Sequence, residues 1–180
     1  GPPLKVGVAV VDVLTGVHAA TAILAALVGQ LRGRGGAHLD IALFEVGVHS
    51  LVNVGQAALS TGRPAHRHGS AHPTIVPYQT FAATDGLFVL AVGNDEQWVR
   101  VCAALREPER ATQSGWAHNP ERVLQRIDVI GWLSARFASQ SRAHWLQLFE
   151  SARVPAGAVR EVHEVVTDSA LNERGMVGEG

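Results

Sequence analysis

The chain has 180 residues, 47% of them hydrophobic and 17% charged, which is enough to bury a core in one domain or in two small ones. Its 15 basic and 16 acidic side chains give a net charge of -1, which excludes the basic excess typical of a nucleic-acid interface. A single cysteine excludes an internal disulfide and fits a reducing compartment, so we expect a cytoplasmic protein that binds no nucleic acid.

An almost unbroken apolar stretch covers residues 6–31 and contains one carboxylate, Asp12. Downstream of Asp12, apolar side chains recur at helical intervals on a stripe that Thr21 completes: Leu14, Val17, Leu24, Val28 and Leu31. The spacing predicts a buried helix from about Leu14 to Leu31, with Asp12 just before its first turn.

Asp12 has two interpretations, because a buried acid is costly unless it lies at an element boundary, is paired or has a chemical role. As a helix cap, it would accept hydrogen bonds from the N–H groups of the first turn. As a carboxylate nucleophile, it would be kept ionised by the positive end of the helix. Spacing alone favours the cap, because capping is common. His18 falls on a different face of the helix, so we expect a packed or surface histidine there.

The same apolar stretch is long enough to span a membrane. Polar side chains within it argue against a membrane span, because such groups are costly in lipid: Asp12, Thr15, His18, Thr21 and Gln30. No basic segment precedes the stretch at a useful distance, so we do not expect a signal peptide. We therefore expect a soluble core helix and no membrane partner.

A glycine-rich break, RGRGG, follows at residues 32–36. Alternating apolar residues then predict a strand over His38 to Leu43. A helical stripe predicts a second helix from about Phe44 to Ser60, with Gly62 as its expected stop. Helix, strand and helix in this order indicate part of an α/β layered fold.

Residues 63–77 are rich in Gly, Pro, His and Ser, which predicts a linker and a domain boundary. His66, His68 and His72 in this segment raise the question of zinc. No cysteine lies nearby and the next carboxylate is Asp85, so we expect a polar loop and no metal site.

Two short apolar runs, from Tyr78 and from Phe88, surround a Thr-Asp-Gly turn and predict a β-hairpin. Asn94 or Asp95 is expected to cap the next helix, in which Trp98, Cys102 and Leu105 share one face. Cys102 is therefore predicted to be a core residue, since no feature of the sequence would activate it as a nucleophile.

Asn119 followed by Pro120 predicts the start of a helix that continues to about Phe137. Its apolar stripe consists of Val123, Ile127, Ile130, Leu133 and Phe137. Ser141 is expected to begin another helix, followed by an extended stretch from Val154 to Val159 and a last helical segment from about Glu161 to Val166.

Several sequence motifs resemble one family when they are taken together. They are GPPLKVGVAVVDVLTG at residues 1–16, GRGGAHLDIALFE at 33–45, HPTIVPYQTF at 72–81, TDGLFVLAVGNDEQW at 84–98, WLQLFESARVPAGAV at 145–159 and ERGMV at 173–177. This combination resembles the class III CoA-transferases, the CaiB/BaiF family. The family also contains formyl-CoA transferase and the related α-methylacyl-CoA racemase.

The resemblance implies an α/β fold, with part of a Rossmann-like large domain over residues 1–62 and a smaller α+β domain over residues 78–168. Residues 169–180 would begin the return to the large domain. Family members are considerably longer and form interlocked homodimers, so we expect this chain to be a fragment that is inactive by itself. The missing N-terminal portion carries most CoA contacts in the family, so no residue here is assigned to CoA binding.

The family's catalytic Asp matches Asp12, which implies an aspartyl acyl anhydride and then an aspartyl thioester with CoA. The expected activity is transfer of CoA between carboxylic acids, with acyl-CoA as a substrate and no separate cofactor. The motif HPTIVPYQTF resembles enzymes that use dicarboxylic acids and succinyl-CoA. One alternative is a racemase, in which Asp12 would pair with a histidine upstream of this chain. Another is a non-catalytic fragment or oligomerisation module, in which Asp12 is only a cap.

Overall fold

The computed structural model describes residues 4–177, and the chain divides into two compact units, Gly1–Arg67 and His68–Gly180. The boundary between the units lies inside the predicted linker of residues 63–77. The whole is a mixed α/β structure in which the strands of the described residues all belong to one small antiparallel sheet in the second unit. The two units are described separately below.

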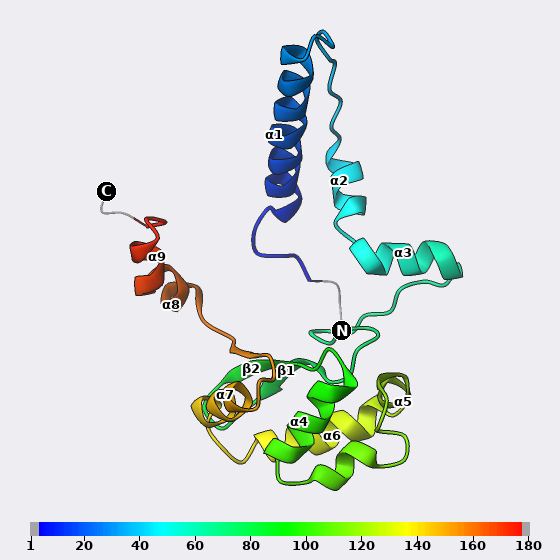
Figure 1. Ribbon diagram of the computed structural model, residues 1–180, viewed down its shortest axis with the longest axis vertical. Coiled ribbons are helices and arrows are strands. Elements are labelled where there is room, and N and C mark those ends of the chain that lie inside the picture. The colour runs from blue at the N-terminus through cyan, green and yellow to red at the C-terminus, as the bar shows by residue number, and fades with distance from the viewer. Residues whose placement is uncertain (1–3, 178–180) are drawn as a thin grey trace. The chain divides into compact units, whose positions relative to one another are not determined.

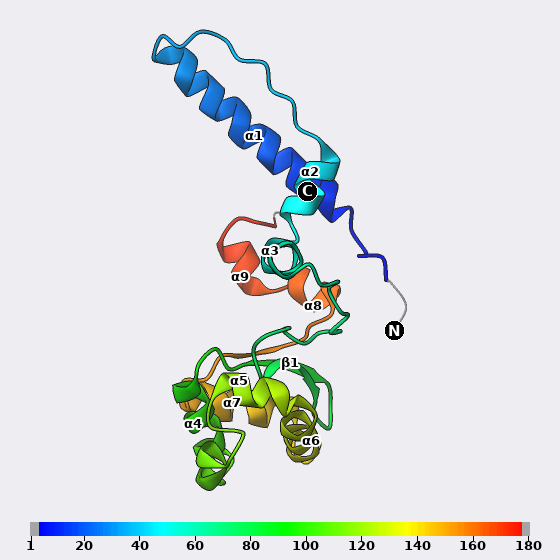
Figure 2. The same cartoon turned by 90° about the vertical axis from the view of Figure 1, so that its right-hand side faces the viewer.

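The first unit is helical and contains α1 (Val10–Leu31), α2 (Leu43–His49) and α3 (Val52–Thr61) (Figure 1). An extended segment leaves the end of α1 and returns to α2 without forming a strand (Figure 2). The predicted strand over His38 to Leu43 is therefore wrong for the described chain, because a strand needs a hydrogen-bonded neighbour.

The predicted helix from Phe44 to Ser60 is divided in two. The break falls at Ser50 and Leu51, and Val52 follows it with a φ of 47°, which a β-branched residue rarely adopts. Gly62 ends α3 in the left-handed conformation at a φ of 65°, which confirms the predicted stop.

The apolar surface of α1 is largely exposed. None of its residues is buried, and Leu24 and Leu31 are 63% and 87% exposed. The prediction of a buried helix is thus wrong for the described residues, because α2 is the element that packs against α1 and it covers only a small part of it. Among the described helices, α1 is long and apolar enough to cross a membrane, a property that core helices of soluble proteins share.

The second unit is built on a three-stranded sheet with the order β1-β2-β3. Strands β1 (Tyr78–Ala82) and β2 (Leu87–Ala91) form the predicted hairpin, and β3 (Ala156–Ala158) pairs with β2 on its other edge, with Phe88 opposite Ala158. Helices and one 3₁₀ turn complete the unit: α4 (Asp95–Ala104), η1 (Pro108–Thr112), α5 (Asn119–Leu124), α6 (Arg126–Phe137), α7 (Arg142–Ser151), α8 (Val162–Val166) and α9 (Ser169–Glu173).

Aromatic rings from the sheet and from α6 and α7 form the core of this unit. The fully buried Phe137 has Phe81, Phe88 and Trp145 at centroid distances of 5.0, 5.1 and 5.1 Å. The Trp145 indole N–H donates to the carbonyl oxygen of Phe137 at 2.9 Å, which satisfies its polar group inside the core. The core therefore fixes α6 and α7 against the sheet.

The predicted caps of α4 and α7 are confirmed. Asn94 Oδ1 accepts from the Gln97 N–H at 2.9 Å, and Ser141 Oγ accepts from the His144 N–H at 3.2 Å.

The predicted helix from Asn119 to Phe137 is instead divided at Gln125, and its first part begins after His118, whose carbonyl oxygen accepts from the Glu121 N–H at 3.0 Å. The break changes the phase of the apolar face. Ile127 is therefore 87% exposed, and Val129 is buried in place of it.

Candidate functional site

Asp12 lies inside the first turn of α1, as its third residue. The helix begins earlier than predicted, because the Val13 N–H already bonds to the Ala9 carbonyl oxygen at 3.1 Å. The prediction that Asp12 precedes the first turn is therefore wrong, although it does lie at the N-terminal end of the helix.

The Asp12 side chain is exposed and does not cap the helix. Among residues 4–177 it has no hydrogen-bond or ion-pair partner, so the cap interpretation that spacing favoured is wrong. The N-terminus of an α-helix carries a partial positive charge that attracts a carboxylate. The Asp12 carboxylate is therefore exposed near this end of the helix, and no other described side chain contacts it.

His18 is engaged in packing away from Asp12. Its Nδ1 lies 2.8 Å from the Leu14 carbonyl oxygen, and its ring meets the His49 ring edge-on at 5.4 Å. A carbonyl only accepts, so Nδ1 carries the proton in this contact. His18 is half-buried, as expected for a packed histidine.

An open pocket of about 400 Å³ lies beside α1 and α2. Its lining consists of His18, Ala22, Asp40, Ile41, Ala42, Glu45, Val46 and His49. Asp12 is not part of this lining, so the pocket does not place either histidine at the Asp12 carboxylate.

The linker histidines are not brought together as ligands. Within the described part of the chain, no group of three or more His, Cys, Asp or Glu side chains has a geometry that could hold a metal ion. His72 Nδ1 accepts from the Thr74 N–H at 3.2 Å, and its ring stacks on that of Tyr78 at 5.4 Å. His72 therefore has a structural environment within the start of the second unit.

Cys102 is fully buried, which confirms its prediction as a core residue. Burial raises the pKa of its thiol to about 12, against the smaller opposing effect of the Arg122 and Arg110 charges. The thiolate is the nucleophilic form of cysteine, so Cys102 is unreactive near neutral pH.

A buried arginine in the second unit was not anticipated from the sequence. Arg122 is fully buried and donates to Asp95 Oδ1 at 2.8 Å and to the Val76 carbonyl oxygen at 2.8 Å. It also donates to the carbonyl oxygens of Trp116 and Ala117, both at 2.9 Å. One side chain thereby connects the segment before β1 with the start of α4 and the loop before α5.

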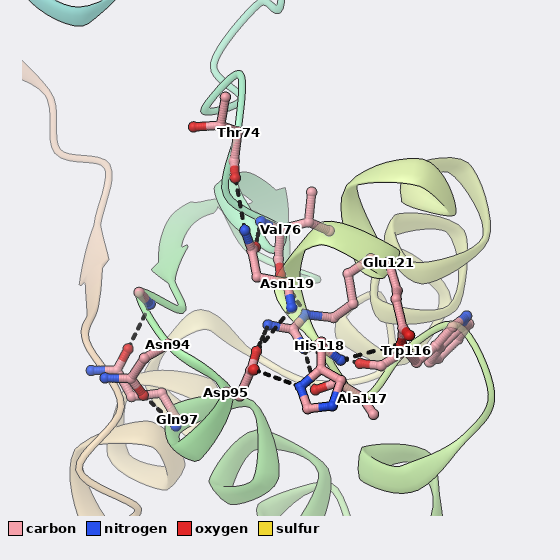
Figure 3. A network of polar contacts seen from close by, with 12 residues as sticks. Thr74, Val76, Asn94, Asp95, Gln97, Trp116, Ala117, His118, Asn119 and Glu121 are labelled. Carbon is pink, nitrogen blue, oxygen red and sulfur yellow. Dashed lines mark hydrogen bonds and ion pairs between the residues drawn. The ribbon is translucent and has the colours of Figure 1, made fainter.

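Asp95 is the acidic partner in this network (Figure 3). Its carboxylate meets His118 Nδ1 at 3.0 Å and accepts from the Asn119 N–H at 2.9 Å. Partial burial alone would raise the pKa of Asp95, but the hydrogen bonds from His118 and Arg122 outweigh burial and hold the pKa below its ordinary value of 3.8.

Asn119 and neighbouring side chains hold the segment that precedes β1. Asn119 accepts from the Val76 N–H at 3.0 Å and donates to the Thr74 carbonyl oxygen at 2.8 Å (Figure 3). Arg126 donates to the carbonyl oxygen of His72 at 2.9 Å. The Thr80 N–H also donates to Ser70 Oγ at 3.3 Å. This use of Asn119 explains why it is not the helix cap that its position before Pro120 predicts.

The comparison with known proteins identifies one family across the chain. The sequence profile of CoA-transferase family III matches residues 1–179. The succinate–glutarate CoA-transferase of Agrobacterium fabrum is 37% identical over 176 residues, which are 98% of this chain and 44% of that protein. The succinyl-CoA:glutarate CoA-transferase of Mus musculus is 36% identical over 179 residues, which are 99% of this chain and 41% of that protein.

A solved structure agrees with this result. The crystal structure of a CaiB/BaiF family protein from Brucella suis has a TM-score of 0.76 and 36% sequence identity, and the match covers 98% of this chain and 47% of that one. The chain thus spans less than half the length of these relatives. The match over its own length is nearly complete, and the chain belongs to CoA-transferase family III.

Proposed function

We propose that the protein containing this chain transfers CoA from an acyl-CoA to a carboxylic acid, with Asp12 as the nucleophile. The observation that carries the proposal is the Asp12 carboxylate itself, exposed in the first turn of α1 and without a partner among the described residues. It lies in the motif GPPLKVGVAVVDVLTG, whose Asp resembles the catalytic residue of the family.

The first half of the reaction loads Asp12. A carboxylate oxygen attacks the thioester carbonyl of the donor, the C–S bond breaks, and CoA leaves as a thiolate while a mixed anhydride forms. The thiolate then attacks the aspartyl carbonyl and breaks the C–O bond of the anhydride. This step releases the donor acid as a carboxylate and leaves an aspartyl thioester with CoA.

The second half reverses these steps with a new acid. The acceptor carboxylate attacks the aspartyl thioester, which releases the CoA thiolate and forms a second anhydride. The thiolate attacks the acceptor's acyl carbonyl, and the products are the new acyl-CoA and the free Asp12 carboxylate. The cycle needs no net proton and no further cofactor, because each leaving group is the next nucleophile or a product.

We infer that the acids are dicarboxylates and that succinyl-CoA is a donor. The motif HPTIVPYQTF supports this inference, as do two relatives that are named for succinate or succinyl-CoA and glutarate. The relatives are named transferases, so the racemase alternative is not favoured. The alternative in which Asp12 only caps the helix would require a side-chain hydrogen bond to the first turn, and Asp12 makes no such bond among the described residues.

The organisation of the whole protein is part of the same proposal. Residues 1–62 would belong to a Rossmann-like large domain, residues 78–168 to the small domain, and residues 169–180 to the return of the chain. The large domain would cover α1, and the protein would be an interlocked homodimer in the cytoplasm without a membrane segment. The family membership and the exposed apolar surface of α1 support this arrangement.

The decisive experiment traps the aspartyl intermediate in the full-length protein. Incubation with succinyl-CoA and hydroxylamine should convert Asp12 to a hydroxamate, which mass spectrometry of the digested protein would locate. Asp12→Asn should give no hydroxamate and no measurable CoA transfer to glutarate, while its circular dichroism spectrum stays that of the parent. Full turnover by Asp12→Asn, or a hydroxamate on a different carboxylate, would contradict the proposal.

A further inference from the structure

The second unit contains a pocket to which the proposed reaction assigns no role. It has a volume of about 230 Å³ and lies where the end of α4, the end of α6 and the start of α7 meet. Its lining consists of Ala104, Leu105, Arg106, Arg136, Ser139, Gln140, His144, Trp145 and Leu148. Asp12 belongs to the other unit and is not part of this lining.

The pocket is rich in basic groups. Arg106, Arg136 and His144 face it, and none of the described residues that line it carries a carboxylate. Gln140 adds an amide group that can donate hydrogen bonds, whereas the Ser139 hydroxyl already donates to the Arg136 carbonyl oxygen at 2.7 Å. A concave surface with donors and cationic side chains of this kind favours negatively charged ligands.

Neighbouring acids do not cancel this charge. Arg136 Nη2 lies 2.7 Å from Glu107 Oε1, but the same carboxylate is also bound by Arg110 at 2.6 Å. The guanidinium groups of Arg136 and Arg110 therefore share one carboxylate, so Glu107 neutralises Arg136 only in part. Arg106 adds another, and its guanidinium has no hydrogen-bond or ion-pair partner among residues 4–177.

The backbone conformation at Arg106 does not require an arginine side chain. Arg106 follows the end of α4 with a φ of 61°, a conformation that glycine usually supplies after a helix. The next N–H, from Glu107, bonds to the Cys102 carbonyl oxygen at 2.9 Å and closes the turn without the Arg106 side chain. The guanidinium is therefore available to a ligand.

We propose that this pocket binds an oxyanion, a phosphate or carboxylate group, through the guanidinium groups of Arg106 and Arg136. A guanidinium presents paired donors that match the oxygens of either group. His144, near the start of α7, provides a further polar contact. Leu105, Trp145 and Leu148 form an apolar wall that accommodates a short hydrocarbon portion of the ligand.

A matched pair of glycine variants tests the site. Arg153 ends α7 in the same way as Arg106 ends α4, with a φ of 53° and a closing bond from the Val154 N–H to the Phe149 carbonyl oxygen at 2.9 Å. Arg153 is not part of the pocket. Glycine is well tolerated at both positions, so Arg106→Gly and Arg153→Gly should both fold.

The full-length protein and both variants would be titrated calorimetrically with inorganic phosphate and with butyrate, at pH 7 and constant ionic strength. Arg106→Gly should bind the anion about tenfold more weakly, because it loses a charge-assisted hydrogen bond, and Arg153→Gly should bind like the parent. The NMR signals of the His144 ring should move during titration of the parent and of Arg153→Gly.

The two anions distinguish the possible ligands. Binding of phosphate alone, of butyrate alone or of both supports the site, and identifies its preferred oxyanion, when Arg106→Gly weakens that binding and Arg153→Gly does not. Equal binding by Arg106→Gly and the parent, or no binding of either anion, would overturn the proposal. The comparison of the variants does not depend on whether Asp12 is the nucleophile, since the titration involves no CoA transfer.

Discussion

Arg122 places a full positive charge inside the second unit, where its side chain is completely buried. A buried charge is tolerated only when it is paired and fully hydrogen-bonded. Asp95 and the carbonyl oxygens of Val76, Trp116 and Ala117 meet this requirement. The guanidinium also lies over the Trp98 ring, 5.0 Å from its centroid.

The lowered pKa of Asp95 makes the stability of this unit depend on pH. The folded state releases the Asp95 proton more readily than the unfolded state, so the stabilisation is complete above pH 3.8 and is lost as the pH falls through the folded pKa. Asp95→Asn should therefore unfold at lower urea concentration than the parent at pH 6, and the difference should shrink below pH 3.8. Tryptophan fluorescence can follow this unfolding.

Asp128 provides the control for this prediction, because it is an exposed carboxylate on α6. Asp128→Asn should leave the urea midpoint close to that of the parent at both pH values. A difference between Asp95→Asn and the parent that stays constant from pH 6 to pH 2.5 would contradict the assigned role of Asp95.

The helices of the second unit begin where local sequence signals place them. Ser141 caps α7 through its hydroxyl group, and Trp145 on the same helix packs into the core. Ser141→Ala should lower the free energy of unfolding by about 1 kcal/mol, because the His144 N–H loses its partner.

Ser134→Ala changes an exposed serine on α6 and serves as the matched control. It should change the free energy of unfolding by less than about 0.5 kcal/mol. Both values can be measured by urea unfolding of the 180-residue chain. Equal effects of the two variants would mean that the cap contributes nothing.

The sequence predicts those features that depend on neighbouring residues. The hairpin of β1 and β2, the caps Asn94 and Ser141 and the stop at Gly62 all depend on local turn and cap chemistry. The expected strand at His38 fails because strand pairing depends on a distant neighbour. The burial of Arg122 could not be predicted either, since its acceptors lie as far away in sequence as Val76.

The environment of Asp12 could be predicted from the sequence only in part. Its position at the start of a helix followed from the apolar periodicity, but the spacing favoured a cap that the structure does not contain. Only the surrounding motif pointed to a nucleophile, because helix geometry is the same for a capping and a catalytic carboxylate.

At the scale of the whole molecule, the exposed apolar side of α1 requires a covering surface. We expect the remainder of the full-length protein to cover it, as proposed above. Leu24→Cys should react rapidly with maleimide in the isolated chain, where Leu24 is 63% exposed, and slowly in the full-length protein. Cys102 should not react with maleimide at pH 7, since it is buried and its thiol pKa is about 12.

Mass spectrometry of the labelled peptides gives both rates. Protection of the introduced thiol in the full-length Leu24→Cys variant without lipid would support a core helix. Protection that requires phospholipid vesicles would instead indicate that α1 enters a membrane, and would contradict the proposed fold of the whole protein.

The attachment of the segment before β1 also has a mechanical consequence. Asn119, Arg122 and Arg126 hold the backbone from His72 to Val76 against the second unit, and Thr80 reaches back to Ser70. Much of the linker therefore moves as a rigid part of that unit. A hinge between the two units would have to pivot upstream of Ser70, on a short stretch of chain after Gly62.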